Sequence, residues 1–573
     1  MTLKSYYLAV ILLLSACNNN SKMSNTDIEG IKEAISVSPG CYNSITNDKE
    51  WYNSGKKAPK FKGLEGIHFT ISTPSKEAQE YFNQGMMLSY GFNHAEAARS
   101  FYEAIKLDSG CAMAYWGFAY VLGPNYNGGM EEDNYQRAFN AVQKAQSLSK
   151  KSTAKERSLI NALATRYTAQ APKDRSALDK AYAEAMKKVY NQFPTDADIG
   201  ALYAEALMNL HPWDLFEKQS KKPRAWTPEL IDVLEKLIKN NPKHPGAHHF
   251  YIHALEASSY PEKALASAAL LDKMVPGSGH LLHMPSHIYI NTGHYHLGSQ
   301  SNLKAIEMDS IYSTACHAQG VYPLAYYPHN YHFLAATATL EGNAGLAWMA
   351  STKLQQHTAK DLMTQPEWGT LQHYYSIPYY IAVKLSMWDT ILTLPRPEKN
   401  LIYPEVIWHY AKGMAFLGKK DLPKAQNELD RLAFLSADTS LQHLTIWNIN
   451  NTADLSQIAL KILSAEIAAK KNLYNEAILL LKEAIAIEDN LNYNEPPDWF
   501  FSVRHHLGKI LLQAGKPAEA EEIYRQDLKT WKNNGWALMG LYKSLAMQKK
   551  NKEAQVVKTA FDKAWQSADI KLD

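Results

Sequence analysis

Apolar residues recur at intervals of three and four along nearly the whole chain from about Ala78 onward. This spacing places them on one face of an amphipathic helix. Short turns that contain glycine, asparagine or proline separate one periodic segment from the next. The pattern therefore predicts an all-α fold made of a succession of short helices.

Small and large residues repeat within this pattern with a period of 34. Ala264 and Gly298 are 34 residues apart, and Ala520 and Ala554 are separated by the same interval. One clear unit reads Tyr81-x3-Gly85-x2-Leu88 and then Ala97-x3-Phe101-x2-Ala104-x3-Asp108. Small residues let two helices of a unit approach closely, and large ones fill the gaps between neighbouring units.

These units resemble the tetratricopeptide repeat, and the resemblance covers about Ala78 to Gln566. It implies a right-handed superhelical solenoid of about eight or nine helix-turn-helix units. First helices would line a concave groove, with repeat positions 2, 5, 9, 12 and 13 facing it. The segment CAMAYWGFAYVLGPNYN is similar to a subfamily of bacterial exported repeat lipoproteins of uncharacterised activity.

The first 17 residues read as an export signal. Lys4 precedes an apolar run, Leu8 to Leu14, which is too short to cross a membrane as a helix. Leu14-Ser15-Ala16-Cys17 resembles the bacterial lipobox, which implies lipidation of Cys17 and attachment to the outer membrane, facing the periplasm or the cell surface. The alternative is an ordinary signal peptide with an incidental cysteine.

The expected organisation has four parts. Residues 1–16 form the signal peptide, and residues 17–65 form a lipidated tether with an N-terminal extension. Residues 66–390 form the N-terminal and central repeats, and residues 391–573 form the C-terminal repeats.

Composition narrows the functional classes. Lys and Arg number 60 and Asp and Glu 57 among 573 residues, so the net charge of +3 does not favour nucleic-acid binding. Four cysteines exclude a disulfide scaffold and a multi-cysteine zinc fold. We find no phosphate-binding loop, dinucleotide fingerprint, His-Glu-x-x-His or Gly-x-Ser-x-Gly motif, and this leaves catalysis open.

Histidine is the unusual residue, because 12 of the 21 histidines lie between His244 and His332. The repeat register places most of them at groove positions, together with several polar residues. The resulting candidate groove residues are Glu205, Asn209, His249, His253, Glu256, His280, His283, His287, His329 and His332.

Four of these histidines form the candidate metal site. His249 and His253 are four residues apart on one helix face, and His283 and His287 repeat that spacing 34 residues later. Imidazoles at this spacing can share a metal ion, and a set with carboxylates suits zinc, copper, nickel or iron. Pro285 lies between His283 and His287 and is expected to interrupt the second helix there.

The groove admits other interpretations. It can bind a small organic ligand or a protein partner without a metal, and its histidines can simply pack between repeats. A metal-dependent hydrolase built from the same residues is another alternative, and so is an assembly scaffold. Trp213 and Asp214 lie in an insertion that can either cap the groove or form a loop held down by its tryptophan.

Overall fold

The computed structural model describes residues 48–316, 327–365, 368–398 and 400–572, and most of them lie in helices joined by turns and loops. Cys17 and the rest of the leader lie outside the described residues. Among the residues that are described, no helix has both the length and the apolar character needed to span a bilayer.

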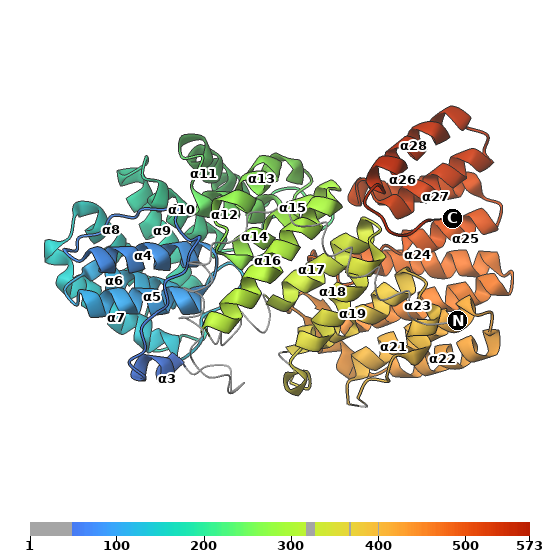
Figure 1. Ribbon diagram of the computed structural model, residues 1–573, viewed down its shortest axis with the longest axis horizontal. Helices are drawn as coiled ribbons and strands as arrows, with labels where there is room; N and C mark the ends of the chain where they lie inside the picture. The colour runs from blue at the N-terminus through green and yellow to red at the C-terminus, as the bar shows by residue number, and fades with distance from the viewer. Residues whose placement is uncertain (1–47, 317–326, 366–367, 399, 573) are drawn as a thin grey trace, which may run out of the picture.

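The N-terminal and central helices run as far as the histidine-rich region (Figure 1). Their bounds are α3 Asp48–Asn53, α4 Lys76–Tyr90, α5 His94–Leu107, α6 Ala112–Val121, α7 Asn134–Leu148, η1 Ser149–Lys151, α8 Ala154–Ala164, α9 Ser176–Gln192, α10 Ala197–Met208, α11 Thr227–Asn240, α12 Pro245–Leu255, η2 Pro261–Ala264, α13 Leu265–Met274, α14 Gly279–His283, α15 Pro285–Thr292, α16 Tyr295–Cys316, α17 Tyr327–Leu340 and α18 Ala344–His357.

The C-terminal helices follow, with one two-residue hairpin. Their bounds are η4 Lys360–Leu362, α19 Gly369–Lys384, α20 Trp388–Thr393, α21 Ile402–Gly418, α22 Leu422–Leu435, η6 Thr439–Gln442, β1 Thr445–Ile446, β2 Asn450–Asn451, α23 Thr452–Lys470, α24 Tyr474–Asn490, α25 Arg504–Gln513, α26 Pro517–Thr530, α27 Gly535–Met547 and α28 Asn551–Ala564.

Successive helices pack as pairs and form an all-α tetratricopeptide-type array. Within the described ranges the pairs are α4/α5, α6/α7, α8/α9, α10/α11, α12/α13, α14–α15/α16, α17/α18, α19/α20, α21/α22, α23/α24, α25/α26 and α27/α28. These are twelve pairs, whereas the spacing predicts eight or nine. One unit that escapes the repeat spacing is α19/α20, because α20 has six residues and contains no alanine or glycine.

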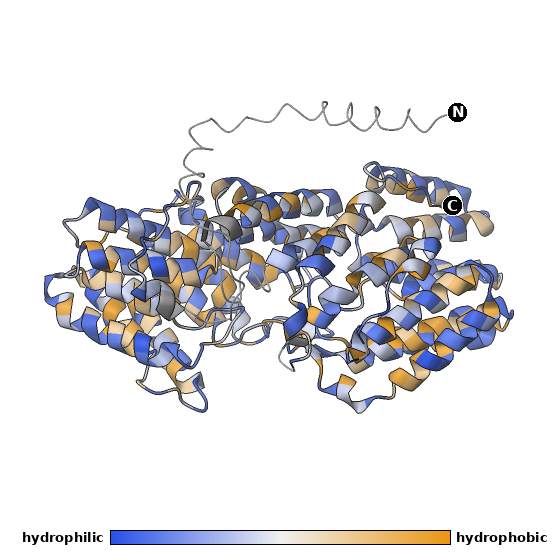
Figure 2. Ribbon diagram, turned by 60° about the horizontal axis from the view of Figure 1, so that its bottom comes forward, coloured by the Kyte–Doolittle hydropathy of each residue, from blue (hydrophilic) through white to orange (hydrophobic). Residues whose placement is uncertain are grey.

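The small-to-large packing expected from the repeat is present. Phe101 of α5 lies between Gly85 of α4 and Gly117 of α6, and a methyl group on either glycine would come within 2.7 Å of the phenylalanine ring. Hydrophobic and hydrophilic residues are interleaved along the helices (Figure 2). Each helix therefore buries one face against its neighbours in the array.

The core falls into two main clusters that meet near residue 290. One cluster contains buried residues from Ala58 to Tyr289, and the other contains residues from Ile290 to Ala554. The C-terminal helices also contact the middle of the chain, since Trp536 Nε1 donates to the carbonyl of Thr339 at 3.3 Å. The histidine-rich helices therefore lie at the junction of the two clusters.

Candidate metal centre

Two groups of three histidines lie side by side at this junction. Histidine trio 1 consists of His249 and His253 on α12 and His280 on α14. Histidine trio 2 consists of His283 on α14, His287 on α15 and His329 on α17. Within each trio, one ring nitrogen per residue lies within 4.8 Å of the other two.

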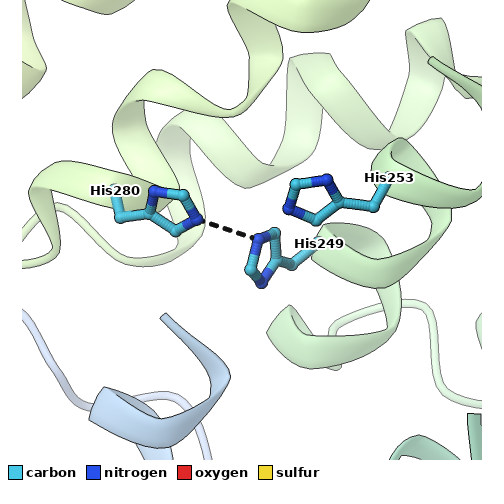
Figure 3. A group of neighbouring side chains, drawn as sticks. All are labelled: His249, His253 and His280. Carbon is cyan, nitrogen blue, oxygen red and sulfur yellow. Dashed lines mark hydrogen bonds between the residues drawn. The ribbon is translucent and has the colours of Figure 1, made fainter. Parts of the chain in front are cut away.

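In trio 1 the three imidazoles face a common point (Figure 3). His249 Nε2 and His280 Nε2 are 3.2 Å apart, and His253 Nε2 is buried without a hydrogen-bond partner. Two nitrogens bound to one ion at about 2 Å with a tetrahedral angle are about 3.3 Å apart. A hydrogen bond between His249 and His280 also fits this distance, but it leaves His253 unpaired.

Trio 2 has the same form. His283 Nε2 and His287 Nε2 are 2.9 Å apart, and the His329 ring centroid lies 5.0 Å from that of His283. Pro285 does break the helix, because α14 ends at His283 and α15 begins at Pro285. The break nevertheless leaves His283 and His287 aimed at each other.

Acceptors hold the other ring nitrogen of several of these histidines. His249 Nδ1 is 2.5 Å from the carbonyl oxygen of Tyr90, and His283 Nδ1 is 2.7 Å from Asn302 Oδ1. Tyr374 Oη lies 3.5 Å from His329 Nδ1. Acceptors in this position fix the tautomer and orientation of metal-binding imidazoles.

Glu256 links the two trios. Its Oε1 lies 2.9 Å from His253 Nδ1 in trio 1, and its Oε2 lies 2.8 Å from His287 Nδ1 in trio 2. Glu495, from the segment between α24 and α25, approaches the same His287 nitrogen at 2.5 Å. We call Glu256 and Glu495 the carboxylate pair.

One phenylalanine ring packs against the three imidazoles of each trio. The Phe92 ring centroid lies 4.6 Å from that of His249, 5.7 Å from His253 and 5.6 Å from His280. Phe333 approaches the three rings of trio 2 at 4.6 to 5.1 Å. These rings exclude water and lower the local dielectric.

Burial sets the charge of the imidazoles. It lowers the pKa of His249, His280, His283 and His329 well below that of a free imidazole, and neighbouring rings lower it further. These four rings are therefore neutral at neutral pH, which is the form that binds metal.

His287 differs because of the carboxylate pair. Burial disfavours its charged form, but Glu256 and Glu495 outweigh this effect and raise its pKa to about 10. Burial raises the pKa of Glu495 to about 7. For Glu256, attraction to His253 and His287 outweighs burial and lowers the pKa to about 2.

The remaining predicted residues lie outside the trios. Glu205 lies 3.6 Å from the Arg166 guanidinium, and Asn209 donates to Glu205 at 2.5 Å, so these two form a separate buried cluster. His332 is buried against Phe500 and His373, and neither of its ring nitrogens has a partner.

The insertion supplies one contact to trio 1. Trp213 stacks on Tyr126 at 5.3 Å and lies edge-on to His253 at 6.0 Å. Its side chain is 37% exposed, so it lies between trio 1 and solvent. Asp214 pairs with Arg224 and does not approach the histidines.

The predicted groove histidines are covered, except for the half-buried His329, and do not line an open surface. The rings of His249, His253, His280, His283, His287 and His332 are at most 4% exposed. Sequence reasoning missed Glu495, because no spacing links it to a histidine more than 200 residues away. It also missed Asn302, which occupies repeat position 24, where a large apolar residue is expected.

No family model and no curated protein sequence matches the chain. Among solved structures, a human IFIT1 dimer with m7Gppp-AAAA aligns with 88% of this chain and 99% of its own, at 11% identity and a TM-score of 0.30. The Cut9-Hcn1 hetero-tetramer of the APC/C covers 87% of this chain and 79% of its own, at 15% identity and a TM-score of 0.29. Yeast Tom70 covers 86% and 93%, at 12% identity and a TM-score of 0.25. Similarity this low carries no information about the ligand of this chain.

Proposed function

We propose that the protein binds two transition-metal ions in neighbouring sites, one on each histidine trio. The convergence of three imidazoles in each trio carries this proposal. The acceptors on His249, His253 and His283 support it, because they hold the ring nitrogens opposite the shared point.

Packing of the histidines without a metal explains the arrangement of the ring nitrogens less well than metal binding does. His253 Nε2 is buried and unpartnered, and leaving such a group unsatisfied costs about 1–3 kcal/mol. A metal ion at the centre of trio 1 would satisfy it. A set of three imidazole nitrogens suits zinc, copper, nickel or iron.

The direct experiment is a metal titration of the full chain after removal of bound metal with a chelator. Zinc, copper, nickel and iron are added separately, and bound metal is measured after desalting. We expect two equivalents of at least one metal, with a higher unfolding temperature. Failure of all four metals to bind would contradict the proposal.

Hydrolysis at these ions is the second candidate. Three protein ligands per ion leave an open coordination position, as in catalytic zinc sites, where a bound water becomes the nucleophile. The zinc-loaded chain would then hydrolyse activated ester or phosphoester probes, and the His280→Ala, His329→Ala double variant, which removes a ligand from each trio, would abolish the activity. A loaded chain that is inactive on both probe classes would argue for metal binding without this chemistry.

A further inference from the structure

The two trios need a route by which an ion can reach them. Five of their six rings are at most 4% exposed, and a phenylalanine covers each group. A hydrated cation must therefore pass through a defined opening and lose its water ligands on the way.

A cleft of about 740 Å³ leads from solvent to the carboxylate pair. One wall is formed by the turn after α12, which includes Ser259, and by Asn291 at the end of α15. The opposite wall is the segment before α25, which includes Tyr493 and Glu495. This volume leaves room for a cation together with its water molecules.

The carboxylate pair forms the floor of the cleft. Glu256 and Glu495 are 2% and 4% exposed, and both line the cleft while approaching His287 of trio 2. Glu256 Oε2, Glu495 Oε2 and His287 Nδ1 lie close together, but none of the three atoms has a partner with hydrogen-bond geometry.

Neighbouring side chains fix the position of Glu495, and acidic side chains pair with two of the basic residues at the rim of the cleft. Asn291 Nδ2 donates to Glu495 Oε1, so Glu495 Oε2 remains directed at His287. At the rim, Arg504 is bonded to Asp489 and Lys532 to Glu262. Lys218, Lys221 and Lys529 also line the cleft; Lys218 donates to the carbonyl of Asn490, and Lys221 lies over the Tyr493 ring. The acidic oxygens lie at the floor of the cleft.

We propose that this cleft is the entry route for the metal and that Glu256 and Glu495 form a transfer site for a divalent transition-metal cation. Carboxylate oxygens replace water ligands of the incoming ion, and the ion then passes to the imidazoles, which bind these metals well. This inference rests on the proposed function, because it requires that the trios bind metal.

The test is the rate of zinc uptake by the chelator-stripped full chain, followed by stopped flow. Glu495→Gln keeps the shape of the side chain and removes its charge, so we expect zinc uptake at least tenfold slower than in the wild type. Ser259→Trp, which narrows the cleft without touching a trio, is expected to slow both uptake and removal by a chelator. Asp232→Asn, on α11 and not among the residues that line the cleft, is the matched loss of one carboxylate charge and should change the rate less than twofold.

Wild-type uptake rates in both Glu495→Gln and Ser259→Trp would overturn the entry route. A zinc uptake rate that changes in Trp213→Ala but not in Glu495→Gln would also overturn this route. That result would place the entry of the metal beside trio 1. In both cases the wild-type chain still binds two equivalents. Failure of the metal-binding proposal is recognised separately, because no zinc would then bind.

Discussion

At the residue scale, the two ring nitrogens of a trio histidine contact different groups. In His249, His253 and His283 one nitrogen faces a protein acceptor, and the other faces the centre of its trio or remains free. This division distinguishes a ligand set from a cluster of packed rings, because packing does not require the free nitrogens to converge. Glu256 is special because it contacts both groups.

Glu256→Gln is expected to weaken metal binding at both trios by about 10–100-fold, the usual cost of losing an acceptor behind a metal-binding histidine. The amide keeps the size of the side chain but accepts through one oxygen only. A competitive titration against a chelator of known affinity measures both sites. Loss of affinity at one trio alone would show that Glu256 does not couple them.

Asn302→Ala is expected to weaken trio 2 alone, by about 10–100-fold, because Asn302 accepts from His283 and from no ring of trio 1. The same titration should show one unchanged site. Ser299→Ala, on the same helix one turn away, controls for general destabilisation of α16. Equal weakening of both sites in Asn302→Ala would refute the assignment of Asn302 to trio 2.

At the element scale, the repeat spacing predicts packing better than it predicts element boundaries. Tyr524 of α26 lies between Gly508 of α25 and Gly540 of α27, so a large residue of one helix fills the space left by small residues on its two neighbours. The break at Pro285 is also visible in the sequence. Its consequence is not, because the convergence of His283 with His287 depends on how α14 and α15 pack against α16 and α17.

Gly540→Ala is expected to destabilise the C-terminal repeats by about 1–3 kcal/mol, because the added methyl group would lie 2.2 Å from the Tyr524 ring. Thermal unfolding followed by circular dichroism measures the effect. Gly129→Ala is the matched control, since nothing lies within 4 Å of the added atom. Identical unfolding curves for the two variants would contradict this packing.

At the scale of the whole molecule, the candidate centre depends on contacts between distant parts of the chain. The periodicity and the 34-residue interval predict the all-α repeat fold and bring four of the six trio histidines into one expected site, with His280 and His329 as neighbouring groove residues. They cannot predict that the groove is filled, because Phe92 and Glu495 reach the histidines from segments far away in the sequence. Glu495 in particular is placed by its contact with Asn291.

The lipid anchor expected at Cys17 is a separate prediction. Full-length protein expressed in a bacterium with the lipoprotein pathway should fractionate with membranes and incorporate labelled fatty acid. Cys17→Ser should abolish the label and release the protein from the membrane fraction, because no other acylation site is expected. Membrane association without label in the wild type would contradict the lipobox.

The most direct test of the two-site centre is the metal count of individual chains by native mass spectrometry. We predict two zinc ions in the wild type, one in His280→Ala, one in His329→Ala and none in the double variant. His248→Ala, which removes a buried histidine bonded to Ser267, should retain both ions. Loss of all metal in each single variant would show one shared site, and two ions in the double variant would show that the trios do not bind metal.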